Sequence, residues 1–229
     1  MSFSPDSYLT PPLTRWSTLW YHQLATDPRW LGALEASLLI AVCTSVLSVL
    51  VATPAALAMH QWPAAPRRGL MLFVLLPALL PPTAMGCGLL PLFQRIGLWG
   101  TYHGLVLAHA ILALPIAFLI LQSAVDERLA HLESTAAGLG ASPRQVFWKI
   151  TGPLLRPALA TAAIVAFVLS LNESLVSLFL TTADNETLPA LIWPQLRYAP
   201  TPVVAVASAV TTGLSLAALP FLVRRIVTR

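Results

Sequence analysis

The segment from Asp126 to Pro157, DERLAHLESTAAGLGASPRQVFWKITGPLLRP, separates two long apolar runs and decides how the chain folds. It carries too many charged and polar residues to cross a membrane, yet its apolar residues are regularly spaced. Leu129, Leu132, Ala136 and Leu139 recur at intervals of three and four. This periodicity predicts a short helix with a single apolar stripe.

Local signals also predict where this short helix ends and where the next one begins. Gly138 and Gly140 are expected to end it, because glycine tolerates the left-handed conformation at a helix C-terminus. Ser142 then acts as the N-cap of a second helix, with Pro143 in its first turn and Gln145 completing a capping box. The apolar stripe either packs on the chain's own helix ends or docks against a cytoplasmic partner. Docking is favoured because the sequence has no soluble domain of its own.

The composition indicates that lipid is the solvent for most of the chain. Of its 229 residues, 57% are hydrophobic and 10% are charged, whereas a soluble domain carries about 25% charged residues. The charges are clustered and leave long uncharged stretches, which is typical of membrane spans. The net charge of +4 does not indicate a nucleic-acid partner, because no segment interleaves basic and aromatic residues. We therefore predict an all-α, polytopic membrane protein.

Five apolar runs are long enough to cross a hydrocarbon core, which takes about 20 helical residues. They are expected to be helices, because backbone groups in lipid need hydrogen-bond partners within the same segment. The predicted spans are Leu31–His60, Gly69–Phe93, Gly104–Val125, Leu154–Leu180 and Thr201–Val223. Prolines within them predict kinks, and the Pro81-Pro82 pair either lines a transport path or simply bends a packing helix.

The basic residues predict the orientation in the membrane. Nine of the thirteen fall in the loop after the first span, the loop before the fourth span and the C-terminal tail, which share one side. The positive-inside rule makes that side cytoplasmic, so the C-terminus is expected inside. Residues 1–30 are predicted to be an external or interfacial segment without a signal peptide, and Trp16, Trp20, Tyr21 and Trp30 suit the outer interface. Residues 31–229 form the transmembrane domain, with the cytoplasmic loop at 126–157.

The segment Asp126–Pro157 resembles the "EAA…G" cytoplasmic loop of binding-protein-dependent ABC permeases. The match runs through Leu139–Pro143 and continues through Phe147, Ile150-Thr151 and Pro153–Leu155 to Pro157. The resemblance implies the type I ABC importer permease fold with a short cytoplasmic coupling helix, to which the apolar runs add about five transmembrane helices. The family commonly begins with an additional helix, which residues 1–30 do not match. It assigns the contact with a partner ATPase to Leu132, Glu133, Ser134, Ala136, Leu139, Gly140, Ala141, Ser142 and Pro143. Ser134 stands where the family has Glu, although Glu133 immediately precedes it.

Two further segments extend the resemblance over nearly the whole chain from Leu31. LAHAILALPIAF, at Leu107–Phe118, is similar to the family's third core helix. Ser170–Thr182 and Thr187–Ser208 resemble the spermidine/putrescine-type branch. The resemblance implies cytoplasmic ABC ATPase subunits, a second permease subunit, identical or different, and a periplasmic or lipid-anchored solute-binding protein. It places the chain in a bacterial inner membrane, with membrane lipid around it and no nucleic acid bound.

The sequence contains no catalytic or cofactor site, since phosphate-binding GxxxxGK[ST] loops, nucleophile elbows and HExxH motifs are all missing from it. Cys43 and Cys87 lie inside apolar runs without metal-ligand spacing and are expected to be small core residues. The chain is therefore interpreted as a transport subunit and not an enzyme. We expect the partner ATPase to drag the coupling helix as a rigid body and so to tilt the attached spans.

Asn172 and Glu173 are the predicted residues of the translocation path. A carboxylate at bilayer depth is costly and usually faces a cavity or a partner, and Glu173 also falls on the acidic position of the polyamine-type pattern. The alternative is that Glu173 is protonated or bonds a neighbouring helix. Glu35 is expected near a membrane face, and His109 is expected to be a hydrogen-bonded packing residue and not a ligand.

Two other functional classes fit the sequence less well than an ABC permease. An ion-gradient-driven secondary carrier would usually show two comparable repeats and more intramembrane charge than one convincing acid. A membrane enzyme using His103, His109 and Glu173 would need a motif spacing that these residues lack. Within the ABC class a polyamine substrate is favoured, while related permeases handle phosphonates, opines, iron or thiamine.

Overall fold

The computed structural model describes residues 2–3, 16–198 and 201–227. All regular elements within these residues are helices, as expected. In chain order they are α1 (Leu19–Thr26), α2 (Pro28–Gln61), α3 (Ala64–Leu75), η1 (Leu76–Leu79), α4 (Pro82–Ile96), α5 (Tyr102–Ala124), α6 (Glu127–Gly138), α7 (Pro143–Val146), η2 (Phe147–Thr151), α8 (Gly152–Leu171), α9 (Leu175–Leu180), α10 (Leu188–Tyr198) and α11 (Pro202–Val227).

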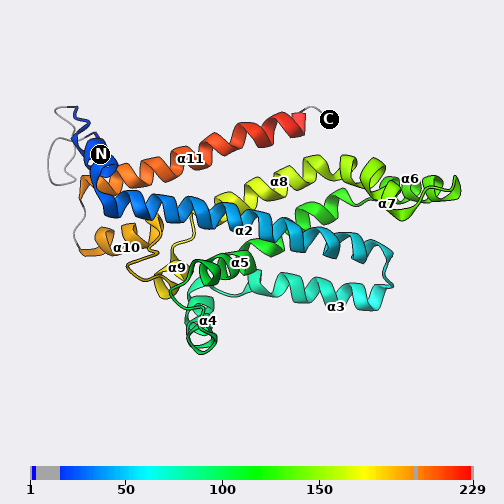
Figure 1. Ribbon diagram of the computed structural model, residues 1–229, viewed down its shortest axis with the longest axis horizontal. Coiled ribbons are helices and arrows are strands. Elements are labelled where there is room, and N and C mark those ends of the chain that lie inside the picture. The colour runs from blue at the N-terminus through cyan, green and yellow to red at the C-terminus, as the bar shows by residue number, and fades with distance from the viewer. Residues whose placement is uncertain (1, 4–15, 199–200, 228–229) are drawn as a thin grey trace.

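The long helices α2, α5 and α8 pack against one another and form the centre of the molecule (Figure 1). Small side chains, among them Ala52, Ala56, Ala117 and Ala162, are buried where these helices meet. Small residues let helix backbones approach closely, which is how helices associate in lipid, where the hydrophobic effect gives no preference for protein contacts over lipid contacts. The bundle is therefore suited to a membrane interior.

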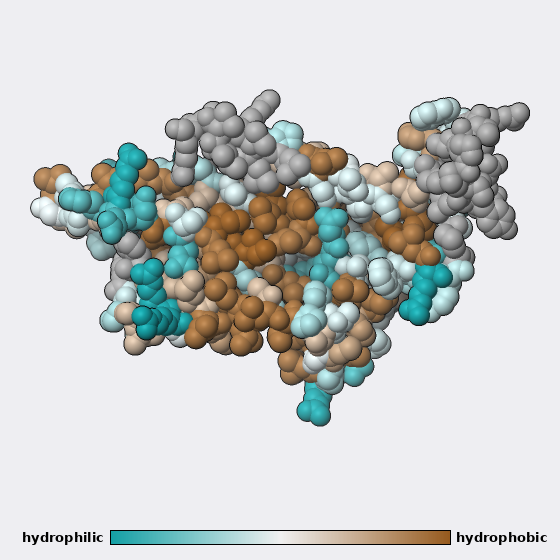
Figure 2. All heavy atoms as spheres, turned by 180° about the vertical axis from the view of Figure 1, so that it is seen from behind, coloured by the Kyte–Doolittle hydropathy of each residue, from teal (hydrophilic) through white to brown (hydrophobic). Residues whose placement is uncertain are grey.

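Three helices of the described chain are long and apolar enough to cross a membrane, or four if one bent pair counts as a span. Two correspond to the first and third predicted runs, and the remaining one, Pro143–Leu171, covers most of the fourth run. The fifth run corresponds to α11, Pro202–Val227, which is apolar over its described part Pro202–Ala218. Figure 2 shows the result on one face, where apolar residues fill the middle and hydrophilic residues gather toward the ends.

The second predicted span, Gly69–Phe93, is wrong as a continuous helix. The chain runs through α3 and η1, breaks at Leu80 and Pro81, and resumes in α4 at an angle of 102°. Two successive prolines explain the break, since neither has an N–H to donate and the residue before a proline is disfavoured in the helical conformation.

The fourth predicted span, Leu154–Leu180, is also interrupted. Helix α8 ends at Leu171, and α9 begins at Leu175 after three polar residues. Helix α9 packs chiefly against α4, so the two broken spans meet. Their contact is close at Gly86, where an added Cβ would lie 2.5 Å from Cδ2 of Phe179.

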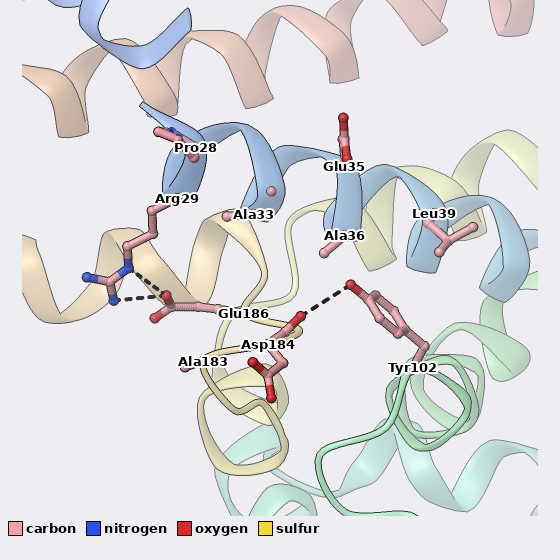
Figure 3. A pocket seen from close by; sticks show the side chains of 11 residues that line it. Pro28, Arg29, Ala33, Glu35, Ala36, Leu39, Tyr102, Ala183, Asp184 and Glu186 are labelled. Atoms are coloured by element: carbon pink, nitrogen blue, oxygen red, sulfur yellow. Dashed lines mark hydrogen bonds and ion pairs between the residues drawn. The ribbon is translucent and has the colours of Figure 1, made fainter. Parts of the chain in front are cut away.

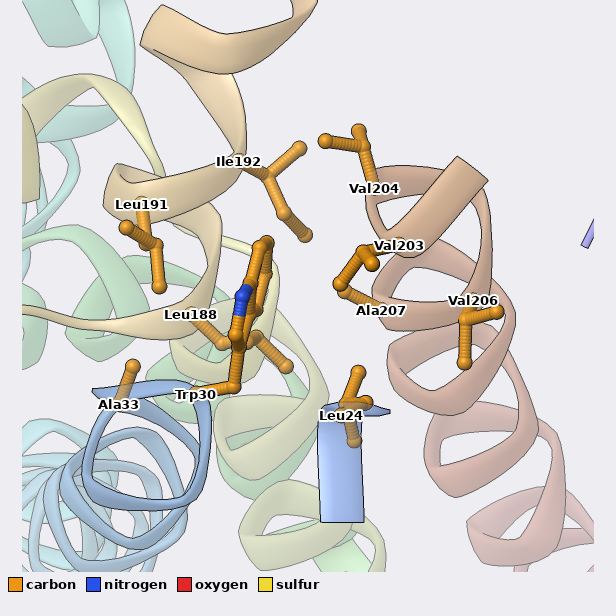
Figure 4. Close-up of a cluster of buried hydrophobic side chains, with 10 residues drawn as sticks. All are labelled: Leu24, Trp30, Ala33, Leu188, Leu191, Ile192, Val203, Val204, Val206 and Ala207. Carbon is orange, nitrogen blue, oxygen red and sulfur yellow. The ribbon is translucent and has the colours of Figure 1, made fainter. Parts of the chain in front are cut away.

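The N-terminal helix α1 packs on α11 and completes a hydrophobic cluster with the start of α2 and with α10 (Figure 4). Trp30 lies at the centre of this cluster and is only 5% exposed, so it is not one of the rings at an outer surface. Cys43 and Cys87 are exposed on the outside of α2 and α4, which corrects the expectation that they are core residues. Hydropathy alone does not say which side of an apolar helix faces the core.

Figure 1 shows which loops share an end of the molecule. The α2–α3 turn and the α6–α7 segment lie at one end, toward which α11 runs, while the start of α2 and α10 lie at the other. This matches the grouping of basic segments deduced from the sequence. Arg15 and Arg229 lie outside the described residues, as do the side chains of Arg224 and Arg225.

Candidate functional site

The coupling loop, defined here as residues 126–157, folds largely as its sequence predicts. The Asp126 side chain accepts a 2.9 Å hydrogen bond from the Leu129 amide and so begins α6. The helix ends at Gly138, and Gly140 has a φ of +87°. Leu129 is buried, whereas Leu132 and Leu139 are 40% and 85% exposed. The apolar stripe is therefore divided, with Leu129 packed on the chain, Ala136 half-buried, and Leu132 and Leu139 left open.

The second half of the loop begins with the predicted capping box. The Ser142 amide donates to Oε1 of Gln145 at 2.8 Å, and the Gln145 amide donates back to the Ser142 hydroxyl at 3.4 Å. The helix then continues in a form that the sequence did not predict, because residues Phe147–Thr151 make a π-helical turn before α8. Such turns insert one extra residue into a helix and occur frequently at functional sites.

One side-chain bond ties α6 to the base of α8. The hydroxyl of Thr151, which is buried, donates to Oε1 of Glu133. The neighbouring Ser134, in the position where the family has Glu, is exposed and donates to the backbone oxygen of His131 at 2.9 Å. The structure therefore joins the loop through Glu133, and sequence spacing gave no signal for a bond between residues 18 positions apart.

The predicted ATPase-contact residues lie together on α6, the Gly140 turn and the start of α7. Two grooves flank this part of the loop. The larger, of about 550 Å³, is lined by residues that include Glu133, Ser134, Ala141 and Pro143. The other, of about 520 Å³, is lined by residues that include Ala136, Leu139, Gly140 and Ala141. The loop thus offers exposed apolar side chains between two grooves at one end of the molecule.

A separate cavity of about 220 Å³ lies where the two broken spans approach α5. Its walls are mostly apolar and include one carboxylate, and its lining contains neither Lys nor Arg. The lining residues are Ala78, His109, Leu112, Ile116, Leu169, Ser170 and Glu173. Of the two residues predicted for the path, the cavity lining includes Glu173 and not Asn172.

Glu173 lies in the break between α8 and α9 and not inside a continuous helix. Its Oε1 atom accepts hydrogen bonds from the amides of Leu175 and Val176, at 2.8 and 2.9 Å, and so caps α9. Asn172 is exposed, and its Nδ2 donates to the Val168 oxygen at 2.8 Å and to the Ser215 hydroxyl at 3.0 Å. The two residues therefore face different parts of the molecule.

His109 is buried in the wall of this cavity and is hydrogen-bonded, as expected. Its Nδ1 lies 2.8 Å from the Ser170 hydroxyl on α8, and its Nε2 lies 2.9 Å from the Ser177 hydroxyl on α9. His103 is exposed and is not part of the cavity lining. The described residues contain no group of three or more candidate metal ligands. Of the three residues of the enzyme hypothesis, His109 and Glu173 thus share the cavity, and His103 is not part of it.

Another pocket, of about 340 Å³, lies at the end of the molecule opposite the coupling loop (Figure 3). Arg29 and Glu186 form an ion pair of 2.9 Å beside it, and Tyr102 donates to the backbone oxygen of Asp184 at 3.5 Å. Glu35 is exposed there, and its side chain points away from the ion pair. These contacts fasten the start of α2 and the start of α5 to the loop before α10.

A bundle of apolar helices with two interrupted spans, one carboxylate in an interior cavity and a capped loop beyond one end is an architecture that suits a membrane permease. The chain belongs to the family described as binding-protein-dependent transport system inner membrane component, whose model matches residues 48–229. It is thus a permease subunit of an ABC importer. This family membership gives no support to the secondary-carrier alternative.

Several relatives in sequence are permeases. The chain is 30% identical to the putrescine transport system permease protein PotI of Escherichia coli (strain K12), over 80% of this chain and 67% of that one. It is 29% identical to the spermidine/putrescine permease PotC of the same strain, over 87% and 76%. It is 35% identical to the molybdenum permease ModB of Mycobacterium tuberculosis (strain ATCC 25618 / H37Rv), over 69% and 64%.

Solved structures show the same fold. A bacterial ABC transporter involved in the import of the acidic polysaccharide alginate matches with a TM-score of 0.64 at 15% identity, covering 94% of this chain and 84% of that chain. The alginate transporter in complex with an alginate pentasaccharide-bound periplasmic protein matches with a TM-score of 0.68 at 13% identity, covering 91% and 81%. The all-helical membrane fold predicted from the sequence is therefore confirmed.

Proposed function

We propose that this subunit lines the path of a small cationic solute of the polyamine class, and that Glu173 is the residue that attracts it. The observation that carries the proposal is the cavity at the meeting point of two broken spans, with a carboxylate in its wall. Interrupted helices line substrate sites in many transporters, because irregular backbone is tolerated in a membrane only beside protein or a water-filled cavity.

The chemistry of the cavity suits a cation. Ala78, in its wall, has a carbonyl that no helical donor can reach, because Pro81 and Pro82 lack the N–H groups that would bond it. The Glu173 carboxylate supplies negative charge, and no Lys or Arg in the lining neutralises it. Acids within membrane spans are costly and usually mark substrate or ion pathways. PotI and PotC are named for putrescine and spermidine, which supports the same class.

The coupling loop is the proposed docking site for a partner ATPase. Its exposed Leu132 and Leu139 fit an apolar cleft, and its caps keep α6 rigid. A pull on α6 would pass through the Glu133–Thr151 bond into α8, whose far end is the break that holds Glu173. A mechanical path therefore leads from the loop to the cavity without any catalytic group in this chain.

The remaining partners and the topology belong to the same proposal. A second permease subunit would complete the path, and a solute-binding protein would deliver the solute from outside. The solute-binding protein is supported by the periplasmic protein in the alginate transporter complex. The coupling loop and the C-terminus would lie in the cytoplasm. Residues 1–30 would then lie at the outer interface and 31–229 would form the transmembrane domain.

Uptake of radiolabelled putrescine by cells that carry the complete transport system tests the role of Glu173. Replacing Glu173→Gln should raise the KM by about tenfold or more, because a charge-assisted contact with the cation is lost. Glu35→Gln is the matched control, since it removes an exposed carboxylate from the apolar helix α2, and it should leave the KM unchanged. An unchanged KM for Glu173→Gln would refute the proposed path residue.

A further inference from the structure

His109 connects the two sides of the break that contains Glu173. The residue is 2% exposed and projects from α5, while Ser170 belongs to the last turn of α8 and Ser177 to α9. Both ring nitrogens are within hydrogen-bond distance of these hydroxyls, at 2.8 and 2.9 Å. The ring therefore bridges the break from a third helix, and no step of the proposed transport mechanism uses it.

The hydrogen-bond partners determine the direction of this bridge. The Ser177 hydroxyl donates its one proton to the backbone oxygen of Glu173 at 3.0 Å. It must then accept from the ring, which puts the imidazole proton on Nε2. Nδ1 of His109 is left as the acceptor and takes its bond from the Ser170 hydroxyl. The result is one directed chain of hydrogen bonds from Ser170 through His109 and Ser177 to Glu173.

Helix α9 depends on such contacts, because it has only six residues and a helix this short is not stable by itself. Its N-terminus is held by the Glu173 carboxylate and by the chain of hydrogen bonds, while its side is held by α4. The backbone of Glu173 is also bonded to Ser170, whose oxygen accepts from the Glu173 amide at 3.3 Å. The position of the carboxylate is thus set by groups on both sides of the break.

We propose that His109 is a positioning residue for Glu173, and that the chain Ser170–His109–Ser177 fixes where the carboxylate lies in the cavity. The inference rests on the proposed role of Glu173 in the path. His109 does not touch the solute in this mechanism. It acts by holding the break in the observed arrangement, in which Glu173 caps α9 and also lines the cavity.

Serine-to-alanine variants separate this role from ordinary packing. In the putrescine uptake assay, Ser177→Ala should raise the KM by about threefold to tenfold with a smaller change in Vmax, because it removes the bond nearest Glu173. Ser170→Ala should have a smaller effect in the same direction. Ser48→Ala and Ser45→Ala are the matched controls and should leave the KM unchanged. Both are buried serines of α2, the first without a hydrogen-bond partner among the described residues and the second bonded to the Ala163 oxygen at 2.7 Å.

Substitutions of the ring itself supply a rescue test. His109→Gln can keep a donor near the Nε2 position and should retain most of the apparent affinity, whereas His109→Leu should lose it. If His109 only filled space, the leucine variant would behave like the glutamine variant. A KM that follows side-chain volume and not the donor toward Ser177 would overturn the proposal.

A double variant tests whether the effect passes through the carboxylate. Combining Ser177→Ala with Glu173→Gln should raise the KM no further than Glu173→Gln alone, since coupled residues are not additive. Additive effects would show that Ser177 acts elsewhere and would overturn the inference. If Glu173→Gln alone leaves the KM unchanged, the proposed role of Glu173 in the path is refuted. The hydrogen-bond chain is then tested by a second measurement.

That measurement is thiol labelling of the break, which needs no knowledge of the substrate. Ser174→Cys is introduced with Cys43→Ala and Cys87→Ala, so that the only thiol lies within the break. Ser177→Ala should raise its labelling rate by a water-soluble maleimide several-fold, and Ser45→Ala should not. Equal rates in the two variants would show that the hydrogen bonds do not hold the break, whatever solute the importer carries.

Discussion

At the scale of single residues, Gly140 shows how the coupling loop is shaped. Its φ of +87° is a left-handed conformation that side chains with a Cβ rarely adopt. A Cβ added there would meet no atom within 4 Å, so space is not the constraint. The glycine is needed for its backbone conformation alone, because the chain must reverse between α6 and the Ser142 cap.

A matched pair of glycine variants tests this role. Gly140→Val should abolish transport and uncouple ATPase stimulation while the protein still inserts into the membrane, because the left-handed turn costs about 1–2 kcal/mol or more with a β-branched residue. Gly138→Val adds the same side chain at a helical residue that also has open space around it, and should keep most activity. Normal uptake by Gly140→Val would refute the coupling assignment.

Residue-level predictions succeeded where the chemistry is local. The capping box of Ser142 and Gln145 could be read from the sequence, because its partners are three positions apart and the hydrogen bonds depend only on the helix start. The Glu133–Thr151 bond could not be predicted, since it depends on how α6 folds back onto α8. The hydrogen bonds of His109 were expected, but their partners became known only from the packing of three helices.

At the scale of helices, the two interrupted spans are the main difference from the expected topology. Hydropathy shows how long an apolar run is, but it says little about whether the run forms one unbroken helix. The prolines at 81 and 82 predicted a bend, but its angle of 102° depends on the packing of α4 against α9. The break after Leu171 had a weaker signal in Asn172–Ser174, because one polar turn also fits a helix that lines a path.

The contact between these two helices can be tested at Gly86. Gly86→Ala should reduce uptake and lower the free energy of unfolding by about 1–3 kcal/mol. The reason is that the added Cβ would lie only 2.5 Å from Cδ2 of Phe179. Phe179→Leu should restore part of both losses by making room. Gly88→Ala is the control, since a Cβ there meets nothing within 4 Å. If Phe179→Leu worsens the Gly86→Ala variant, the two helices are not packed in this way in the working protein.

At the scale of the whole molecule, the coupling loop and the cavity are joined by a single helix. Helix α8 has 20 residues and is therefore about 30 Å long. It begins just after Thr151, which is bonded to Glu133 of α6, and ends just before the break. The pocket beside Arg29 and Glu186 lies at the opposite end from the loop. In the proposed mechanism, α8 would therefore separate the coupling loop from Glu173 by roughly one membrane thickness.

This arrangement predicts which loops are reached from each side of the membrane. In a protein without Cys43 and Cys87, Leu139→Cys should react with an impermeant maleimide only after the cells are opened. Ala183→Cys, exposed beside the Arg29–Glu186 pocket at the opposite end, should react in intact cells. Labelling of Leu139→Cys in intact cells would reverse the topology and remove the loop from reach of a cytoplasmic motor.

The sharp bend between η1 and α4 also limits where the chain can remain in a bilayer. Leu79 is 80% exposed beside it, and the neighbouring Ala78 carbonyl has no helical donor. Hydrocarbon cannot satisfy such a group. In a single copy surrounded by acyl chains, the Ala78 carbonyl would therefore lack a hydrogen-bond partner. A companion protein or water lying against the bend would supply one. For this chain, assembly would then be the last step of folding.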